Sequence, residues 1–141
     1  MVVGYATSKC QNSELVVRAL AMATKRYKPD GTLVHSDMRS VLKSERYRNA
    51  VKQAGLVQFM GNAGLSVANQ MIESFFGKLK TELLHTRTWT SYDEINKAIT
   101  YYCESFYNSI RPQMVFGGRT PLEEFHRLTT CATNQATISV A

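Results

Sequence analysis

Hydrophobic and polar positions along this chain form short apolar runs separated by longer amphipathic stretches. The short runs, rich in Val, Leu and Tyr, predict strands at residues 1–8, 32–36 and 56–60. Apolar residues at helical spacing predict helices at about residues 12–27, 44–54, 67–83 and 91–110, with a last short helix from about residue 120. Strands that alternate with helices in this order indicate an α/β layer fold with a mainly parallel sheet.

The predicted helix over residues 67–83 has two different neighbouring faces. Its apolar stripe suits a core and consists of Ile72, Phe75, Phe76, Leu79 and Leu83. Its polar stripe lies roughly one residue further round and consists of Asn69, Glu73, Gly77 and Lys80. Taken alone, the polar stripe suits an ordinary solvated helix face as well as it suits a functional one.

Capping and turn residues support these boundaries. Asn12 or Ser13 can cap the first helix, and Gly55 can end the second. Thr120 followed by Pro121 is a typical helix start. Glycine, proline and their polar neighbours predict turns or loops at residues 29–31, 61–64 and 117–118.

Composition fits one soluble domain with a core, since the chain has 141 residues and 44% hydrophobic content. It has no run of 18 apolar residues and no signal-peptide pattern, so we expect no membrane span and a cytoplasmic location. Three widely spaced cysteines without a CxxC pair predict reduced thiols, not a disulfide framework or a zinc site.

Charge favours a polyanionic partner, with nucleic acid first. The net charge is +6, from 17 basic and 11 acidic residues. The excess is concentrated in residues 25–52, which hold eight Lys and Arg residues against three acidic ones. Many basic proteins bind no nucleic acid, so charge alone does not decide this.

Two acidic residues could belong to a metal site. Asp37 ends a predicted strand, and sites in open α/β sheets form outside the carboxyl ends of strands. Glu73, on a helix packed nearby, could join it in holding a hard divalent cation such as Mg²⁺, which suits phosphodiester chemistry. The alternative is that Asp37 caps a turn and Glu73 is a plain surface residue.

Several motifs, in order, resemble the catalytic domain of bacterial insertion-sequence transposases of the retroviral-integrase type. They are HSD at 35–37, AGLVQFM at 54–60, ESFFGKLKTEL at 73–83, FYNSIRPQ at 106–113 and GGRTPLEEF at 117–125. Between Asp37 and Glu73 lie 35 residues, which matches the spacing of the last two carboxylates in that family's Asp-Asp-Glu triad.

The resemblance implies an α/β, ribonuclease-H-like fold that lacks the family's first strands and carries extra C-terminal helices. A partial catalytic core would cover residues 1–128, followed by a disordered tail over residues 129–141. It also implies DNA strand transfer dependent on Mg²⁺ or Mn²⁺. Asp37 would be the second catalytic carboxylate and Glu73 the third, and both would hold the metal.

The same resemblance suggests roles for three further side chains. Lys80 occupies the place of a basic residue that faces DNA in integrases, and Lys78 is a weaker candidate for a DNA contact. Asn69, one turn before Glu73, could orient that carboxylate. An exposed partner for a nearby acidic residue is the alternative role for Lys80.

The sequence departs from the family pattern in ways that predict little autonomous transposition. The only acidic residues before Asp37 are Glu14 and Asp30, and neither is placed to serve as the first catalytic aspartate. The family's glycine-containing stretch after HSD is absent from residues 38–42, the acid before the catalytic helix is missing, and Gln113 stands where the family has histidine.

Three functions therefore stay open from the sequence. The first is a fragment of a transposase catalytic domain that binds DNA, and the second is a non-catalytic DNA-binding or regulatory module that co-assembles with intact transposase. The third is a generic basic α/β domain. The resemblance places the family's first strand at the centre of the sheet. Without that strand the sheet would expose backbone donors and acceptors, which predicts a homo-oligomer or pairing with intact transposase subunits.

Overall fold

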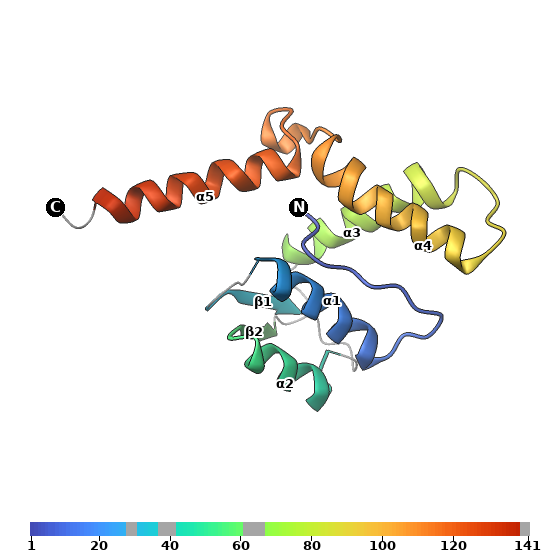
Figure 1. Ribbon diagram of the computed structural model, residues 1–141, viewed down its shortest axis with the longest axis horizontal. Coiled ribbons are helices and arrows are strands. Elements are labelled where there is room, and N and C mark those ends of the chain that lie inside the picture. Colours follow the sequence, from blue (N-terminus) through green and yellow to red (C-terminus); the bar gives the residue numbers. More distant parts are fainter. Residues whose placement is uncertain (28–30, 37–41, 61–66, 139–141) are drawn as a thin grey trace. The chain divides into compact units, whose positions relative to one another are not determined.

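The computed structural model describes residues 1–27, 31–36, 42–60 and 67–138, with the side chains of residues 60, 67–69 and 131–138 excepted. The chain divides into two compact units (Figure 1). One consists of residues 3–82, and the other of residues 1–2 with 83–141. The loop predicted at 61–64 and most of the turn predicted at 29–31 lie outside the described residues.

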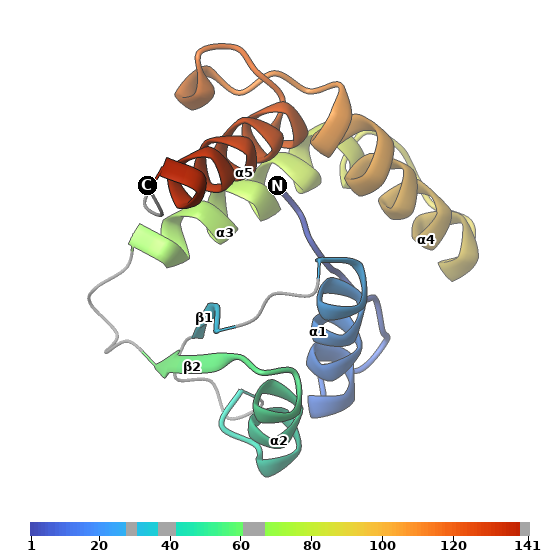
Figure 2. The ribbon, with the colours of Figure 1, turned by 60° about the vertical axis from the view of Figure 1, so that its left-hand side comes forward.

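The unit of residues 3–82 is built on a parallel strand pair joined by a helical crossover. Its elements are α1 (Ser13–Tyr27), β1 (Leu33–Ser36), α2 (Glu45–Gln53), β2 (Val57–Met60) and α3 (Val67–Leu79). The strands β1 and β2 pair in parallel, with Leu33 opposite Val57 and Ser36 opposite Met60. The crossover between them contains α2 (Figure 2). The bounds of α1, β1, α2 and β2 confirm the predicted elements within about a residue at each end.

The core of this unit lies between α1, α2 and one face of the sheet. Its buried members are Tyr47 and Val51 of α2 and Leu56, which precedes β2. Partly buried apolar residues from both helices, β1 and the adjoining loops pack against them: Val16, Val17, Leu20, Val34, Leu42 and Ala54. Ser44 caps α2 by accepting a hydrogen bond from the backbone N–H of Tyr47.

The opposite face of the sheet is bare within the described residues. Alternation along a strand puts Leu33 and His35 of β1 on that face together with Val57 and Phe59 of β2. Leu33 is 66% exposed, Val57 52% and Phe59 49%. On this face the rings of His35 and Phe59 lie with their centroids 5.0 Å apart. An apolar sheet face of this kind normally packs against another layer.

The strand predicted at residues 1–8 is wrong, since these residues form no ladder in the structure. The segment instead passes close to α1. A Cβ on Gly4 would lie 2.4 Å from the carbonyl oxygen of Ala19 and 2.9 Å from the Cβ of Ala23. Only glycine allows that approach, and the described sheet contains no neighbouring strand with which the segment could pair.

The helix predicted over residues 67–83 forms, but its apolar stripe is covered only in part. The α-helix α3 passes into a π-helical segment, η1 (Lys80–Leu84). Leu79 is buried, whereas Ile72 is 53% exposed and Phe76 49% exposed. The prediction that all five apolar residues of this stripe enter a core is therefore wrong. No strand or helix in the described part of the unit covers the first turns of α3.

The second unit is helical. It contains α4 (Tyr92–Tyr101), the π-helical segment η2 (Tyr102–Tyr107), the 3-10 turn η3 (Met114–Phe116) and α5 (Pro121–Ile138). Ser91 caps α4, because its Oγ accepts a hydrogen bond from the backbone N–H of Glu94. Tyr102 and Cys103 are its buried apolar residues. The glycines predicted as a turn, Gly117 and Gly118, both have positive φ.

The start of α5 is fixed by reciprocal capping and by an ion-pair cluster. The backbone N–H of Thr120 donates to Glu123 Oε2, and the backbone N–H of Glu123 donates to Thr120 Oγ1. Glu124, 8% exposed, accepts from both Arg119 and Arg127 at 2.6–3.0 Å. The helix is longer than the short one predicted, and its backbone takes in most of the segment predicted to be a disordered tail.

No helix among the described residues is long and apolar enough to cross a membrane.

Replacing Val51 with Ala tests the core of the unit formed by residues 3–82. Val51 is 2% exposed, so the substitution should lower the free energy of unfolding by about 2 kcal/mol through lost burial and a residual cavity. Val57→Ala removes the same atoms from a side chain that is 52% exposed and should cost much less. Urea unfolding followed by circular dichroism measures both, and equal losses would contradict the described core.

The ion-pair cluster predicts a pH dependence of stability. Hydrogen bonds from Arg127 and Arg119 lower the pKa of Glu124 from 4.5 to about 2. A carboxylate with a lowered folded pKa adds stability above about pH 4.5 and loses it as the pH falls toward 2. Glu124→Gln should therefore lower Tm near pH 6, and the difference from the parent should shrink as the pH falls toward 2. A difference that is the same at both pH values would assign the loss to packing.

Candidate functional site

The carboxyl end of β1 is held by a glutamine on the neighbouring strand. Ser36, the last residue of β1, is 5% exposed. Gln58 Nε2 donates to Ser36 Oγ at 3.1 Å and to the carbonyl oxygen of Leu42 at 3.1 Å. Asp37 follows Ser36 directly and lies outside the described residues. The structure therefore fixes the strand end from which Asp37 extends, and the position of its carboxylate stays a prediction.

Glu73 lies in the middle of α3 with its side chain exposed. Asn69 lies one turn earlier on the same helix, and helical spacing places the two residues on one face. The side chain of Asn69 is outside the description, so its orienting role stays a prediction. Among the described residues, no group of three or more His, Cys, Asp or Glu side chains could hold a metal ion. The described part of the site supplies the single carboxylate of Glu73.

The two predicted DNA-facing lysines differ in exposure. Lys80 is exposed at the first position of η1, and Lys78 is half-buried at the end of α3. The α-helical register holds from Glu73 to Leu79, so Lys80 follows Glu73 by about two turns on nearly the same side. A Cβ added to Gly77, which lies between them, would meet no atom of the described residues within 4 Å beyond its own helix backbone and its chain neighbours. No described residue therefore lies against Gly77 between the carboxylate and the ammonium.

The closing motifs of the sequence have structural roles in the second unit. Asn108, 4% exposed, accepts from the backbone N–H of Val2 and donates to its carbonyl oxygen, both at 2.8 Å. Sequence reasoning missed this tether, since only the family motif singled out Asn108. In the GGRTPLEEF stretch, Thr120 and the two glutamates build the helix start. These contacts position backbone and give no sign of chemistry.

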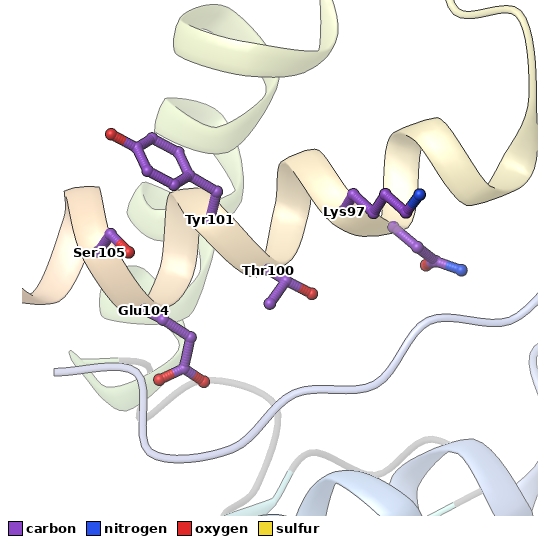
Figure 3. Close-up of a pocket in the computed structure, with 6 residues that line it drawn as sticks. Lys97, Thr100, Tyr101, Glu104 and Ser105 are labelled. Atoms are coloured by element: carbon purple, nitrogen blue, oxygen red, sulfur yellow. The ribbon is translucent and has the colours of Figure 1, made fainter.

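Two other features of this unit are inert. Cys103 is 1% exposed, and burial together with the nearby charge of Glu104 raises the pKa of its thiol to about 11. A shallow, open hollow follows α4 and η2 (Figure 3). All its lining side chains come from this one helical stretch: Asn96, Lys97, Thr100, Tyr101, Glu104 and Ser105. It encloses no volume in which a small ligand would be buried.

Comparison with known proteins finds an integrase family and several transposases among the sequences similar to this chain. Residues 73–130, which begin at Glu73, match the family described as integrase core domain. The chain is 32% identical over 123 residues to a putative transposase of insertion sequence element IS150 from Escherichia coli, covering 86% of this chain and 43% of that protein. It is 32% identical over 122 residues to a transposase of element IS629 from Shigella sonnei, covering 86% and 41%.

A third relative is an uncharacterised transposase-like protein of Haemophilus influenzae, 28% identical over 121 residues, which cover 86% of this chain and 56% of that one. The chain thus spans about half the length of the curated relatives that it matches. Integrase cores have a ribonuclease-H-like fold, and the small parallel sheet with its helices is consistent with part of one. The chain is therefore similar to bacterial insertion-sequence transposases over 86% of its length, and residues 73–130 are similar to the integrase core domain.

Proposed function

We propose that this chain forms part of the catalytic core of an insertion-sequence transposase and acts on DNA in the cytoplasm. The observation that carries the proposal is the exposed carboxylate of Glu73, which stands at the first residue of the integrase-core match. Asp37 directly follows Ser36, the last residue of β1, and supplies the carboxylate that precedes Glu73 in the sequence of the triad. In this proposal they are the third and second members of an Asp-Asp-Glu triad.

The integrase core family generally depends on divalent metal ions. Such an ion, Mg²⁺ or Mn²⁺, activates a water or a 3′-hydroxyl and stabilises the leaving oxygen in phosphodiester chemistry. Asp37 and Glu73 would hold it, and Asn69 would orient Glu73 by a hydrogen bond. Lys80, with Lys78 as the weaker candidate, would contact a DNA phosphate near the scissile bond.

The proposal includes a limit on what these 141 residues do by themselves. Two carboxylates leave the metal site incomplete, and the two acidic residues before Asp37 are Glu14 in α1 and Asp30 in a turn predicted from the sequence, so we expect neither to act as the first aspartate. Strand transfer would therefore need a further aspartate from outside this sequence. We expect the isolated chain to bind DNA and metal weakly and to catalyse little or no strand transfer.

Binding of Mn²⁺ tests this site directly. The parent chain should bind Mn²⁺ weakly, and both Glu73→Gln and Asp37→Asn should remove that binding because each deletes an anionic ligand. Titration followed by electron paramagnetic resonance measures the free ion. Glu45→Gln is the matched control, since Glu45 is another exposed glutamate of the same unit.

A parent chain that binds no Mn²⁺, or a Glu45→Gln variant that loses as much as Glu73→Gln, would contradict the proposed pair of ligands. Strand transfer by the isolated chain on element ends in Mg²⁺ would contradict the proposed incompleteness.

A second candidate function is a regulatory module that co-assembles with intact transposase. The bare outer face of the β1–β2 sheet, with Leu33, Val57 and Phe59 about half exposed or more, favours it. In the described residues, β1 pairs only with β2, so its other edge offers unpaired backbone groups to a strand of another subunit. Assembly would take place as a homo-oligomer or with intact transposase subunits.

Co-purification with an intact transposase of a related element tests the second candidate. The parent chain should be retained by the immobilised transposase and should lower its strand-transfer rate. The double substitution Val57→Ser and Phe59→Ser should weaken both effects, because it removes apolar area from the bare face. Leu128→Ser, at a 54% exposed leucine of the other unit, is the control and should change neither. Retention that ignores the sheet-face substitutions would rule out this surface.

A further inference from the structure

The net positive charge of the chain comes from one of its two units. Residues 3–82 hold twelve of the 17 Lys and Arg residues and six of the 11 acidic residues, which is the whole net charge of +6. Residues 1–2 and 83–141 hold five of each sign and are neutral overall. A polyanion attracted by this charge would therefore meet the unit that contains the sheet, α1 and α2.

Within that unit, packing fixes which side of α2 faces solvent. Tyr47 and Val51 are 5% and 2% exposed, and they lie four residues apart on the inner side of the helix. The outer side of the last two turns consists of four exposed polar residues: Arg48, Asn49, Lys52 and Gln53. Arg48 and Lys52 form one row along the helix, and the two amides form the row beside it.

Neither cation of this row is paired with an acidic residue in the part of the chain that the structure describes. Arg46, one position before Tyr47, is the α2 arginine that has an acidic partner, at 3.8 Å from Glu14 of α1. The only acidic residue of α2 is Glu45 in its first turn. A cation in the last turn complements the helix dipole, which accounts for Lys52, but Arg48 lies in the middle of the helix.

We propose that this face of α2 is a contact surface for the phosphate backbone of duplex DNA. The α-carbons of Arg48 and Lys52 lie about 6 Å apart along the helix axis. Successive phosphates of one DNA strand are spaced roughly 3.4 Å along the duplex axis, so the two side chains can reach two phosphates of one strand. Asn49 and Gln53 add neutral hydrogen-bond donors of the kind that contact phosphate oxygens. Phosphate contacts carry no sequence information, so a surface that contacts only the backbone binds DNA irrespective of sequence.

The position of α2 connects this surface to the proposed catalytic end of the sheet. The helix α2 lies in the crossover between the parallel strands, and Leu42 precedes it. The side-chain amide of Gln58 donates both to the carbonyl oxygen of Leu42 and to Oγ of Ser36 at the end of β1. The first turn of α2 therefore starts at the strand end from which Asp37 extends. The inference rests on the proposed function and adds to it the surface on which DNA leads away from that edge.

Salt dependence of DNA binding tests the inference. The probe is a fluorescent duplex of arbitrary sequence, titrated with the full chain at salt concentrations from about 50 to about 200 mM. The variant combines Arg48→Gln with Lys52→Gln. Loss of two phosphate contacts should reduce the slope of log affinity against log salt by roughly 2, and the affinities of parent and variant should converge as salt rises.

The control removes the same charges from the same unit. Arg18→Gln with Lys25→Gln deletes one arginine and one lysine from exposed positions of α1, and its slope should stay near that of the parent. An equal fall in both slopes would show a general effect of net charge and overturn the α2 surface alone. A parent chain without salt-dependent DNA binding would overturn the proposed function as well. Circular dichroism confirms that each variant keeps the parent fold.

Discussion

Burial of Tyr47 and Val51 beneath α1 and the sheet is the interaction on which the unit of residues 3–82 depends. These two side chains set the rotation of α2 about its own axis. Because α2 lies in the crossover between two parallel strands, it packs on one face of the sheet and leaves the other face exposed. The same constraint turns Arg48 and Lys52 outward. A chain that lost this contact would lose both the strand end that precedes Asp37 and the surface of α2 proposed to contact DNA.

The covered and bare faces of the sheet explain why the core is small. On the inner face, Val34 packs against the helices, whereas on the outer face Leu33, Val57 and Phe59 meet no second layer in the described residues. Met71, Ile72 and Phe76 of α3 are exposed apolar residues in the same unit. Two uncovered apolar surfaces in one small unit are expected where folding is completed by further polypeptide. The chain spans 43% and 41% of the lengths of the two transposases to which it is 32% identical.

Local chemistry explains which parts of the fold could be predicted. Ser44, Ser91 and Thr120 satisfy backbone N–H groups at the starts of three helices, so the sequence alone places these boundaries within a residue or two. The strand expected at residues 1–8 failed because a strand needs a partner that its own sequence cannot supply. The apolar stripe of α3 failed for a related reason: Ile72 and Phe76 have the correct spacing, but spacing does not provide the surface that would bury them.

The candidate site shows the same division between local and long-range information. Motif order and spacing single out Asp37 and Glu73, but whether their carboxylates converge depends on how α3 docks beside β1, which is a tertiary contact that no local pattern encodes. Asn108 shows the converse case. The family motif marks it, yet its observed work is to bind the backbone of Val2 from 106 residues away. A residue of such a motif can therefore hold the fold together without taking part in a reaction. The distribution of charge agrees with this distinction between structural and candidate functional residues. The neutral unit holds the closing motifs as structural anchors, and the basic unit holds both candidate carboxylates and the surplus cations.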